Sequence, residues 1–270
     1  MFTLEPNKRY AMPAHFGPSY TGEKTSGVYH DCTVMALSYV TDREKLAVYL
    51  PEPFEVGEEA VVTVYYVCNK QVDWLAGHGY NMIAVNASVV YRGEKEQLTG
   101  TYSLVMWENL ADPILVGREF QGIPKVYADI PEHSIKDGTW RCNASHFGHK
   151  IVDLSISNLT PVSAEDIVAQ QKLQEGKDHP MAWRFIPALG GFGEPAVNEL
   201  VTFPSENKLT EAWTGEGEIE WARLTWEQNP TQYQIVNALE ALPVLETLPA
   251  IVTKGSSDLS LPERWTRTLV

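Results

Sequence analysis

Long apolar segments are absent from this chain. No stretch approaches the roughly 18 or more apolar residues that a membrane-spanning helix needs. The opening residues, MFTLEPNKRYAMPAHFG, contain no apolar run of the length found in a signal peptide. We therefore expect a cytoplasmic protein that does not work in a membrane.

Cysteine is also scarce. The three cysteines, Cys32, Cys68 and Cys142, are an odd number, lie far apart and form no C-x-x-C motif, so a disulfide framework is not expected. Histidines occur near two of them, but neither group has the four-ligand spacing of structural zinc, and no H-E-x-x-H motif occurs. A cysteine-based zinc site is therefore not expected either.

Positive charge is in deficit. The chain has 21 Lys and Arg residues against 35 Asp and Glu, a formal charge of -14, which would repel nucleic acid and anionic membranes. No G-x-S-x-G motif supports a serine hydrolase. The GGFG stretch at 190–193 lacks the Lys-Ser/Thr pair of a phosphate loop and predicts a hairpin turn instead. Nucleic acid and anionic membranes are therefore not expected as partners.

Most of the chain is typical of short β-strands. Six segments are rich in β-branched and aromatic residues, and several of them alternate in polarity. They are AVVTVYYV (60–67), NMIAVNASVVY (81–91), LTGTYSLVMW (98–107), KIVDLSIS (150–157), MAWRFIPAL (181–189) and NELVTF (198–203).

Only three segments predict helices. TDREKLAVYL (41–50) offers Thr41 or Asp42 as an N-cap, SAEDIVAQQKLQE (163–175) opens with Ser163 and Asp166 at capping-box spacing, and TQYQIVNALEAL (231–242) is a weaker candidate. Many strands, few helices and no long linker predict one mainly β domain over 1–270, an antiparallel barrel or folded-over sandwich. Such a fold can enclose an apolar pocket.

One lysine stands in an apolar setting. In GREFQGIPKVYA (117–128), Lys125 follows a proline and precedes a valine. A lysine attacks a carbonyl only as the neutral amine, and near its ordinary pKa of about 10.4 it is protonated at neutral pH. Complete burial would lower that pKa by up to about 3 to 5 units. The residues alone leave two interpretations, a nucleophile or an ordinary loop cation.

Four landmarks along the chain resemble the acetoacetate decarboxylase family in order and spacing. They are LPEPFEV (50–56), LADPILVGREFQGIPK (110–125), HPMAWRFIPAL (179–189) and LTEAWTG (209–215). The resemblance implies a mainly β, cone-shaped barrel or double barrel, assembly into homo-oligomers, no metal or organic cofactor, and a catalytic lysine that forms a Schiff base with a ketone. Lys125 matches that lysine.

The chemistry implied by the resemblance is that of an electron sink. The protonated imine accepts the electron pair released when a β-keto acid loses carbon dioxide, and hydrolysis then frees the ketone. The same sink also serves aldol addition and dehydration, so fold and lysine do not fix the reaction.

The chain departs from the family at three positions. Decarboxylases of the family carry a second lysine after the nucleophile, where this chain has Val126. The family's active-site glutamate aligns with Met82, and no arginine stands near His30 to Cys32, where the family's active-site arginine is expected. Acetoacetate is therefore a doubtful substrate, and any lowered pKa of the lysine would have to come from desolvation.

Three polar residues beside the lysine are candidate replacements. Gln121 lies four residues before Lys125, and the GREFQG-x-PK pattern resembles family members with aldolase-dehydratase activity, so Gln121 is a candidate to hydrogen-bond a substrate carboxylate or carbonyl. Glu119 is a candidate catalytic charge and Arg118 a candidate substrate ligand. An equally good interpretation makes Arg118 and Glu119 a salt-bridged structural turn.

Three further residues are candidates for the pocket wall. Tyr80 is a candidate proton donor, although a buried tyrosine more often only satisfies a hydrogen bond. Met82 and Met106 would make the pocket apolar and favour a larger, less polar carbonyl substrate.

The leading interpretation is a Schiff-base lyase that decarboxylates a β-keto acid, or a related carbonyl compound, larger and more apolar than acetoacetate. An aldolase-dehydratase that joins a 2-oxo acid and an aldehyde through a lysine imine is the alternative. A non-catalytic carrier of apolar ligands on the same fold is the alternative from another class.

Overall fold

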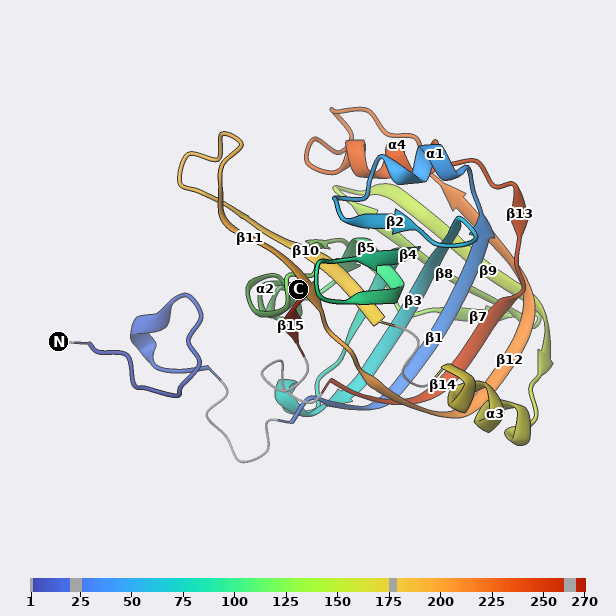
Figure 1. Cartoon of the computed structure of the whole chain (residues 1–270). Helices are drawn as coiled ribbons and strands as arrows, with labels where there is room; N and C mark the ends of the chain where they lie inside the picture. Colours follow the sequence, from blue (N-terminus) through green and yellow to red (C-terminus); the bar gives the residue numbers. More distant parts are fainter. Residues whose placement is uncertain (1, 20–25, 175–178, 260–265) are drawn as a thin grey trace.

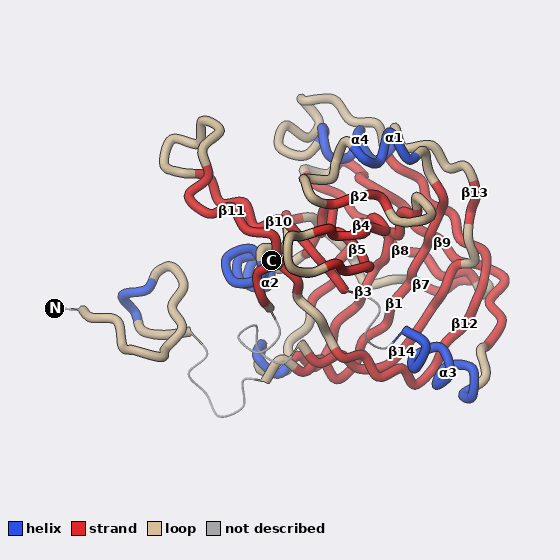
Figure 2. The backbone as a smooth tube through the Cα atoms, viewed as in Figure 1, coloured by secondary structure: helices blue, strands red, loops and turns tan. Residues whose placement is uncertain are grey.

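The computed structural model describes residues 2–19, 26–174, 179–259 and 266–270. Strands dominate the described chain, and the helices lie at the margins (Figure 2). The strands are β1 (Val28–Val40), β2 (Phe54–Val56), β3 (Val61–Val72), β4 (Tyr80–Arg92), β5 (Gln97–Glu108), β6 (Lys125–Tyr127), β7 (Ser134–Lys136), β8 (Thr139–His146), β9 (His149–Pro161), β10 (His179–Pro187), β11 (Pro195–Thr202), β12 (Glu206–Trp221), β13 (Glu246–Thr247), β14 (Ala250–Asp258) and β15 (Arg267–Thr268).

The helices are short. They are α1 (Arg43–Ala47), α2 (Ala111–Val116), α3 (Ala164–Gln174) and α4 (Tyr233–Glu240), with two 3-10 turns, η1 (Ala14–Phe16) and η2 (Asp73–Leu75), and a π-helical turn, η3 (Gly117–Gln121). Asp42, rather than Thr41, is the N-cap of α1, since its carboxylate accepts from the Lys45 amide. At α3, the Asp166 amide donates to Ser163 Oγ, as a capping box requires, and the Asp166 carboxylate accepts from the Ser163 hydroxyl rather than from the Ser163 amide.

All fifteen strands belong to one strongly curved sheet (Figure 1). Its order is β15-β11-β10-β5-β4-β3-β1-β14-β12-β9-β8-β7, with β13 beside β1, β2 beside β4 and β6 beside β5. Pairing is antiparallel except where β5 meets β6 and β10. The mainly β class is confirmed. Over the described ranges the pairing path is open, however, so hydrogen bonds do not close the sheet into the ring that a barrel requires.

The six predicted strands all form, as β3, β4, β5, β9, β10 and β11. The GGFG stretch lies in the turn of the β10–β11 hairpin, which projects from the body in Figure 1. Four long or central strands, β1, β8, β12 and β14, were not predicted, nor was the helical segment formed by α2 and η3.

The core and the pocket lie on opposite faces of the central strands. Along β3, Tyr66 and Cys68 belong to the main hydrophobic core, whereas Tyr65, Val67 and Asn69 line a cavity. This alternation follows from the two-residue period of a strand. No helix in the described ranges is long and apolar enough to span a membrane.

Candidate active site

Lys125 is the first residue of a strand, not a loop cation. It begins β6, which pairs in parallel with the end of β5 so that Lys125 lies beside Met106. Only 6% of the residue is exposed. The expected burial is therefore observed, and the loop interpretation is wrong because the segment after Pro124 adds a strand to the sheet.

Two glycines, Gly117 and Gly122, allow the backbone of η3 to pass close to Lys125 and to end in a left-handed conformation. A Cβ on Gly117 would stand 2.4 Å from Lys125 Cε and 2.7 Å from its Nζ, so the lysine side chain packs against bare backbone. Gly122 ends η3 in the left-handed region, with φ of 73°, which favours glycine. Arg184 of β10 fills the space that a Gly122 side chain would occupy, and it also donates to the Glu119 carbonyl.

A glutamate that the sequence analysis missed is the partner of the lysine. Glu108, the last residue of β5, is fully buried, and its Oε1 lies 2.7 Å from Lys125 Nζ. Nζ also donates to the Pro113 carbonyl of α2 at 3.1 Å. Within the described chain, the Glu108 carboxylate has no other hydrogen-bond partner. The lysine therefore has an anionic neighbour in place of the family's cationic one.

Burial raises the pKa of the Glu108 carboxyl above its ordinary value, and the nearby Lys125 ammonium opposes part of that rise. Desolvation is the larger of the two effects because no water-exposed surface is left on the side chain. A carboxyl in this position can hold a proton at a pH where an exposed glutamate is ionised.

The position of Glu108 accounts for the methionine at the expected glutamate position. Met82 of β4 is the direct cross-strand neighbour of Glu108. Both side chains line the same cavity, so the acidic group is supplied by the adjacent strand. The signal was present in the sequence: Met106 was expected to face the pocket, and Glu108, two residues further along the strand, must face the same way.

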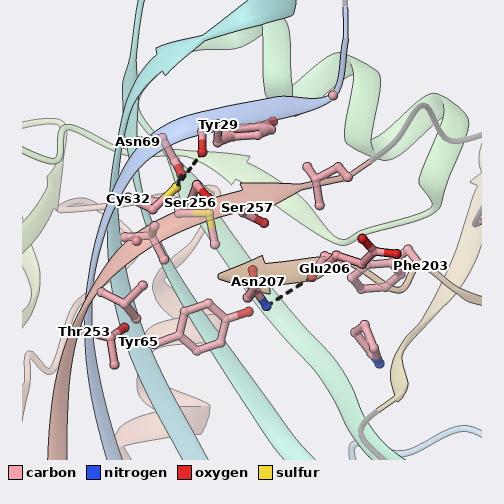
Figure 3. A pocket seen from close by; sticks show the side chains of 18 of the residues that line it. Tyr29, Cys32, Tyr65, Asn69, Phe203, Glu206, Asn207, Thr253, Ser256 and Ser257 are labelled. Carbon is pink, nitrogen blue, oxygen red and sulfur yellow. Dashed lines mark hydrogen bonds between the residues drawn. The ribbon is translucent and has the colours of Figure 1, made fainter. Parts of the chain in front are cut away.

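The pair faces a cavity of about 1310 Å³, which is larger than most small-molecule sites. Its apolar lining includes Met82, Met106 and Ile123, and, further along the sheet, Val34 and Val67. Figure 3 shows part of the wall, where β1 and β3 contribute Cys32, Tyr65 and Asn69 and β14 contributes Thr253 and Ser257. Glu206 and Asn207 of the neighbouring strand β12, and Phe203 before it, also line this part. The apolar wall predicted from the methionines is therefore present.

Tyr80 lies in the pocket wall within a buried tyrosine cluster. Its hydroxyl is 3.2 Å from that of Tyr29, which in turn accepts from Trp74 Nε1 at 3.1 Å. Burial raises the pKa of Tyr29 to about 12 and that of Tyr80 well above its ordinary value. Tyr80 therefore stays protonated at neutral pH and can donate a hydrogen bond, but it cannot act as a base.

The other predicted residues divide into two groups. Gln121 lines the cavity and is buried. Arg118 and Glu119 are not among the lining residues. The Arg118 guanidinium donates to the Lys125 carbonyl at 2.9 Å, which orients the lysine backbone.

One group of side chains in the described ranges has the spacing of metal ligands. Ligand atoms of Cys68, Glu132 and His133 lie within 4.8 Å of one another. The Glu132 carboxylate already pairs with the Lys70 ammonium, and Cys68 lies on the core face of β3, away from the cavity. This group therefore lies outside the cavity that Lys125 faces.

A β-sheet cavity with a buried lysine as its candidate nucleophile defines the class of protein. The family model for acetoacetate decarboxylase matches residues 11–257, so the chain belongs to the acetoacetate decarboxylase family. The acetoacetate decarboxylase of Paraburkholderia xenovorans is 28% identical over 225 residues, which cover 80% of this chain and 77% of that protein.

Solved structures share the fold. Acetoacetate decarboxylase from Legionella pneumophila matches with a TM-score of 0.73 and 18% identity, over 93% of this chain and 94% of that one. The enduracididine biosynthesis enzyme MppR, complexed with the condensation product of pyruvate and imidazole 4-carboxaldehyde, matches with a TM-score of 0.66 and 16% identity, over 96% and 95%.

Proposed function

We propose that the protein is a carbon-carbon lyase in which Lys125 forms a Schiff base with a carbonyl substrate. One observation carries the proposal: the Lys125 amine is buried at the wall of a large cavity and is held there by Glu108 and a backbone carbonyl. A structural lysine needs no cavity in front of its amine, whereas a nucleophile does.

The leading reaction is decarboxylation of a β-keto acid larger and more apolar than acetoacetate. Relatives named acetoacetate decarboxylase support the reaction, and the apolar wall and the cavity volume support the larger substrate. Gln121 and Tyr80 would donate hydrogen bonds to the substrate, and Met82 and Met106 would contact its apolar part. The proposal needs no cofactor or metal, and it keeps the expectation of a homo-oligomer.

Aldolase-dehydratase chemistry is the second candidate, and Glu108 favours it. Adding or removing a hydroxyl group requires a residue that both accepts and donates protons, and the buried carboxyl beside the lysine is suited to that task. MppR, whose structure holds a condensation product of pyruvate and an aldehyde, shares the fold.

The test is covalent trapping. Sodium cyanoborohydride with acetone should reduce an imine on Lys125 to a stable secondary amine, which peptide mass spectrometry locates. Lys125→Met should abolish both trapping and turnover, whereas Lys70→Met, at an exposed ion pair, should leave both intact. Turnover or trapping that survives in Lys125→Met would refute the proposal, whereas a wild type that shows neither would favour the carrier.

A substrate panel then separates the two reactions. Carbon dioxide release from benzoylacetate indicates decarboxylation. Loss of water from pyruvate and benzaldehyde, with a new ultraviolet-absorbing enone, indicates aldolase-dehydratase activity.

A further inference from the structure

Glu108 has a position that stability alone does not explain. Its carboxylate is fully buried, and the Lys125 ammonium, 2.7 Å away, is its only partner in the described chain. A buried ion pair is often no more stabilising than an apolar pair of similar volume, because desolvation of the two charges offsets their attraction. A carboxylate in contact with a nucleophile at a cavity wall is a typical site of proton transfer.

We infer that Glu108 is the proton-transfer residue of this pocket, which takes the proton from Lys125 and passes protons to the bound substrate. The inference rests on the proposed function, because it assigns a step within that reaction. Glu108 contacts the reacting nitrogen directly, and the cavity brings a substrate carbonyl to the same two groups.

Imine formation balances through this one carboxyl group. The ammonium proton moves to Glu108, and the amine lone pair forms a bond to the carbonyl carbon while the C=O electron pair moves to oxygen. Glu108 delivers its proton to that oxygen, takes a second proton from nitrogen and delivers it as the C–O bond breaks. One ammonium and one carbonyl thus give one iminium and one water.

Charge is conserved during these steps. The iminium cation replaces the ammonium cation on the same nitrogen, so the buried Glu108 carboxylate keeps an opposite charge beside it. An unpaired buried carboxylate would be costly. The arrangement therefore suits a reaction whose intermediate is itself a cation at Nζ.

Bond cleavage next makes the nitrogen neutral, and the carboxylate then needs a proton. In aldol cleavage, the β-hydroxyl proton moves to Glu108 as the C–C electron pair moves into the iminium, which gives a carbonyl product, a neutral enamine and a neutral carboxylic acid. The reverse steps describe aldol addition. An uncharged substrate thus reacts when the Glu108–Lys125 pair begins in its ionised form.

Decarboxylation requires a different starting state. The substrate brings its own carboxylate, and the cavity-lining cations other than Lys125, which are Lys172 and Lys208, are exposed. A neutral site therefore requires Glu108 to be protonated when a keto acid binds. In that state the substrate carboxylate, rather than Glu108, accepts the ammonium proton of Lys125, and Glu108 carries the later proton transfers of imine formation. The substrate carboxyl group then returns its proton to Glu108 before carbon dioxide leaves. After carbon dioxide leaves, Glu108 gives its proton to the enamine carbon, and water converts the resulting iminium to the ketone and the Lys125 ammonium. One proton from solvent then restores Glu108, as the overall reaction demands.

This difference predicts opposite pH dependences for the two substrate classes. Burial raises the pKa of Glu108, which favours its protonated form in the folded protein. Decarboxylation of benzoylacetate should slow as pH rises through that raised pKa. Cleavage of diacetone alcohol, an uncharged β-hydroxyketone, should not slow over the same range. A benzoylacetate rate that rises with pH would overturn the inference, and this test needs no variant.

The variant test uses Glu108→Gln, which keeps the shape and removes the acid. Trapping of acetone on Lys125 should persist, because the variant leaves the amine in place at the cavity wall. Turnover of the probe that the wild type accepts should fall about 100- to 10,000-fold, the range for a lost general acid-base residue. Glu108→Asp should recover part of it, and Glu132→Gln, at the exposed pair, should change neither.

The outcomes distinguish the inference from the proposed function. If Glu108→Gln traps acetone and keeps turnover within about tenfold of the wild type, Glu108 transfers no essential proton and the inference is wrong, while the Schiff-base proposal stands. If the wild type neither traps acetone nor turns over any probe, the proposed function itself fails.

Discussion

Two lysine–glutamate pairs of the described chain share their chemistry but not their surroundings. In the Lys70–Glu132 pair, 48% and 55% of the side chains are exposed, whereas in the Lys125–Glu108 pair the figures are 7% and 0%. In the exposed pair each partner stabilises the charge of the other: the pKa of Lys70 is raised, chiefly by its hydrogen bond to Glu132, and that of Glu132 is lowered by the same bond.

The buried pair behaves differently. Attraction to Lys125 lowers the pKa of Glu108, but desolvation raises it by more. Pairing alone therefore does not decide whether a carboxyl group holds or releases its proton; burial does. The pocket makes Glu108 a carboxyl group that can carry a proton, while the surface makes Glu132 a permanent anion.

The largest effect should follow from breaking the buried pair. Lys125→Met leaves Glu108 without a partner and should cost about 3–5 kcal/mol of unfolding free energy, measured by urea denaturation near neutral pH. Lys70→Met should cost less than about 1 kcal/mol. The double variant Lys125→Met/Glu108→Leu should recover most of the loss, since both buried charges are removed. Equal losses of unfolding free energy in Lys125→Met and Lys70→Met would mean that burial does not distinguish the two pairs.

The next effect concerns geometry rather than charge. A methyl group in Gly117→Ala would stand 2.4 Å from Lys125 Cε, so the lysine must shift away from Glu108. Turnover should fall about 100-fold, as it does for displacements near 1 Å. Gly148→Ala has open space around it and is the matched control: it should lower stability through its positive φ and leave turnover unchanged. Normal turnover in Gly117→Ala would mean that the lysine position is not critical.

Much of the site could be predicted from the sequence, because its residues lie on recognisable strands or in a recognisable motif. Met82 and Met106 lie on predicted strands, Tyr80 directly precedes the first of these strands, and Gln121 and Lys125 belong to the GREFQG-x-PK motif. All five line the cavity. Arg118 belongs to the same motif but does not line the cavity, and the sequence could not show this difference. Its direction depends on the π-helical turn, which no sequence periodicity indicates.

The missed features have physical reasons too. β12 contains five Glu and two Gly, residues that strands generally lack, and pairing with β9 and β14 overrides that preference. Glu108 was missed because a glutamate at a strand end is usually solvated. Lys125 reaches Glu108 only because β6 pairs in parallel with β5. The helical segment α2–η3 separates these two strands in the sequence, so the contact is not local.

The contributions of Glu108 and Glu132 to the unfolding free energy should change with pH in opposite directions. Burial raises the folded-state pKa of Glu108, so its contribution to stability is present below the unfolded pKa and is lost as pH rises through the folded value. The lowered pKa of Glu132 gives a contribution that is present above the unfolded pKa and is lost as pH falls through the folded value. The measurement is the unfolding free energy of the wild type, Glu108→Gln and Glu132→Gln across the acidic pH range. The difference between wild type and Glu108→Gln and the difference between wild type and Glu132→Gln should change with pH in opposite directions. Slopes of the same sign would mean that Glu108 is an ordinary ionised partner.

The smallest effect should be that of salt. Raising the ionic strength from about 0.1 M to about 1 M shortens the screening length from about 10 Å to about 3 Å in water. The loss caused by Lys70→Met should then fall towards zero, because solvent ions reach both exposed partners. The loss caused by Lys125→Met should stay nearly constant, because no solvent separates Nζ from Oε1. Urea titrations in sodium chloride measure both losses. A buried-pair loss that falls in step with the surface-pair loss would show that water and ions reach the pair, and the charge balance proposed for Glu108 would then lose its basis.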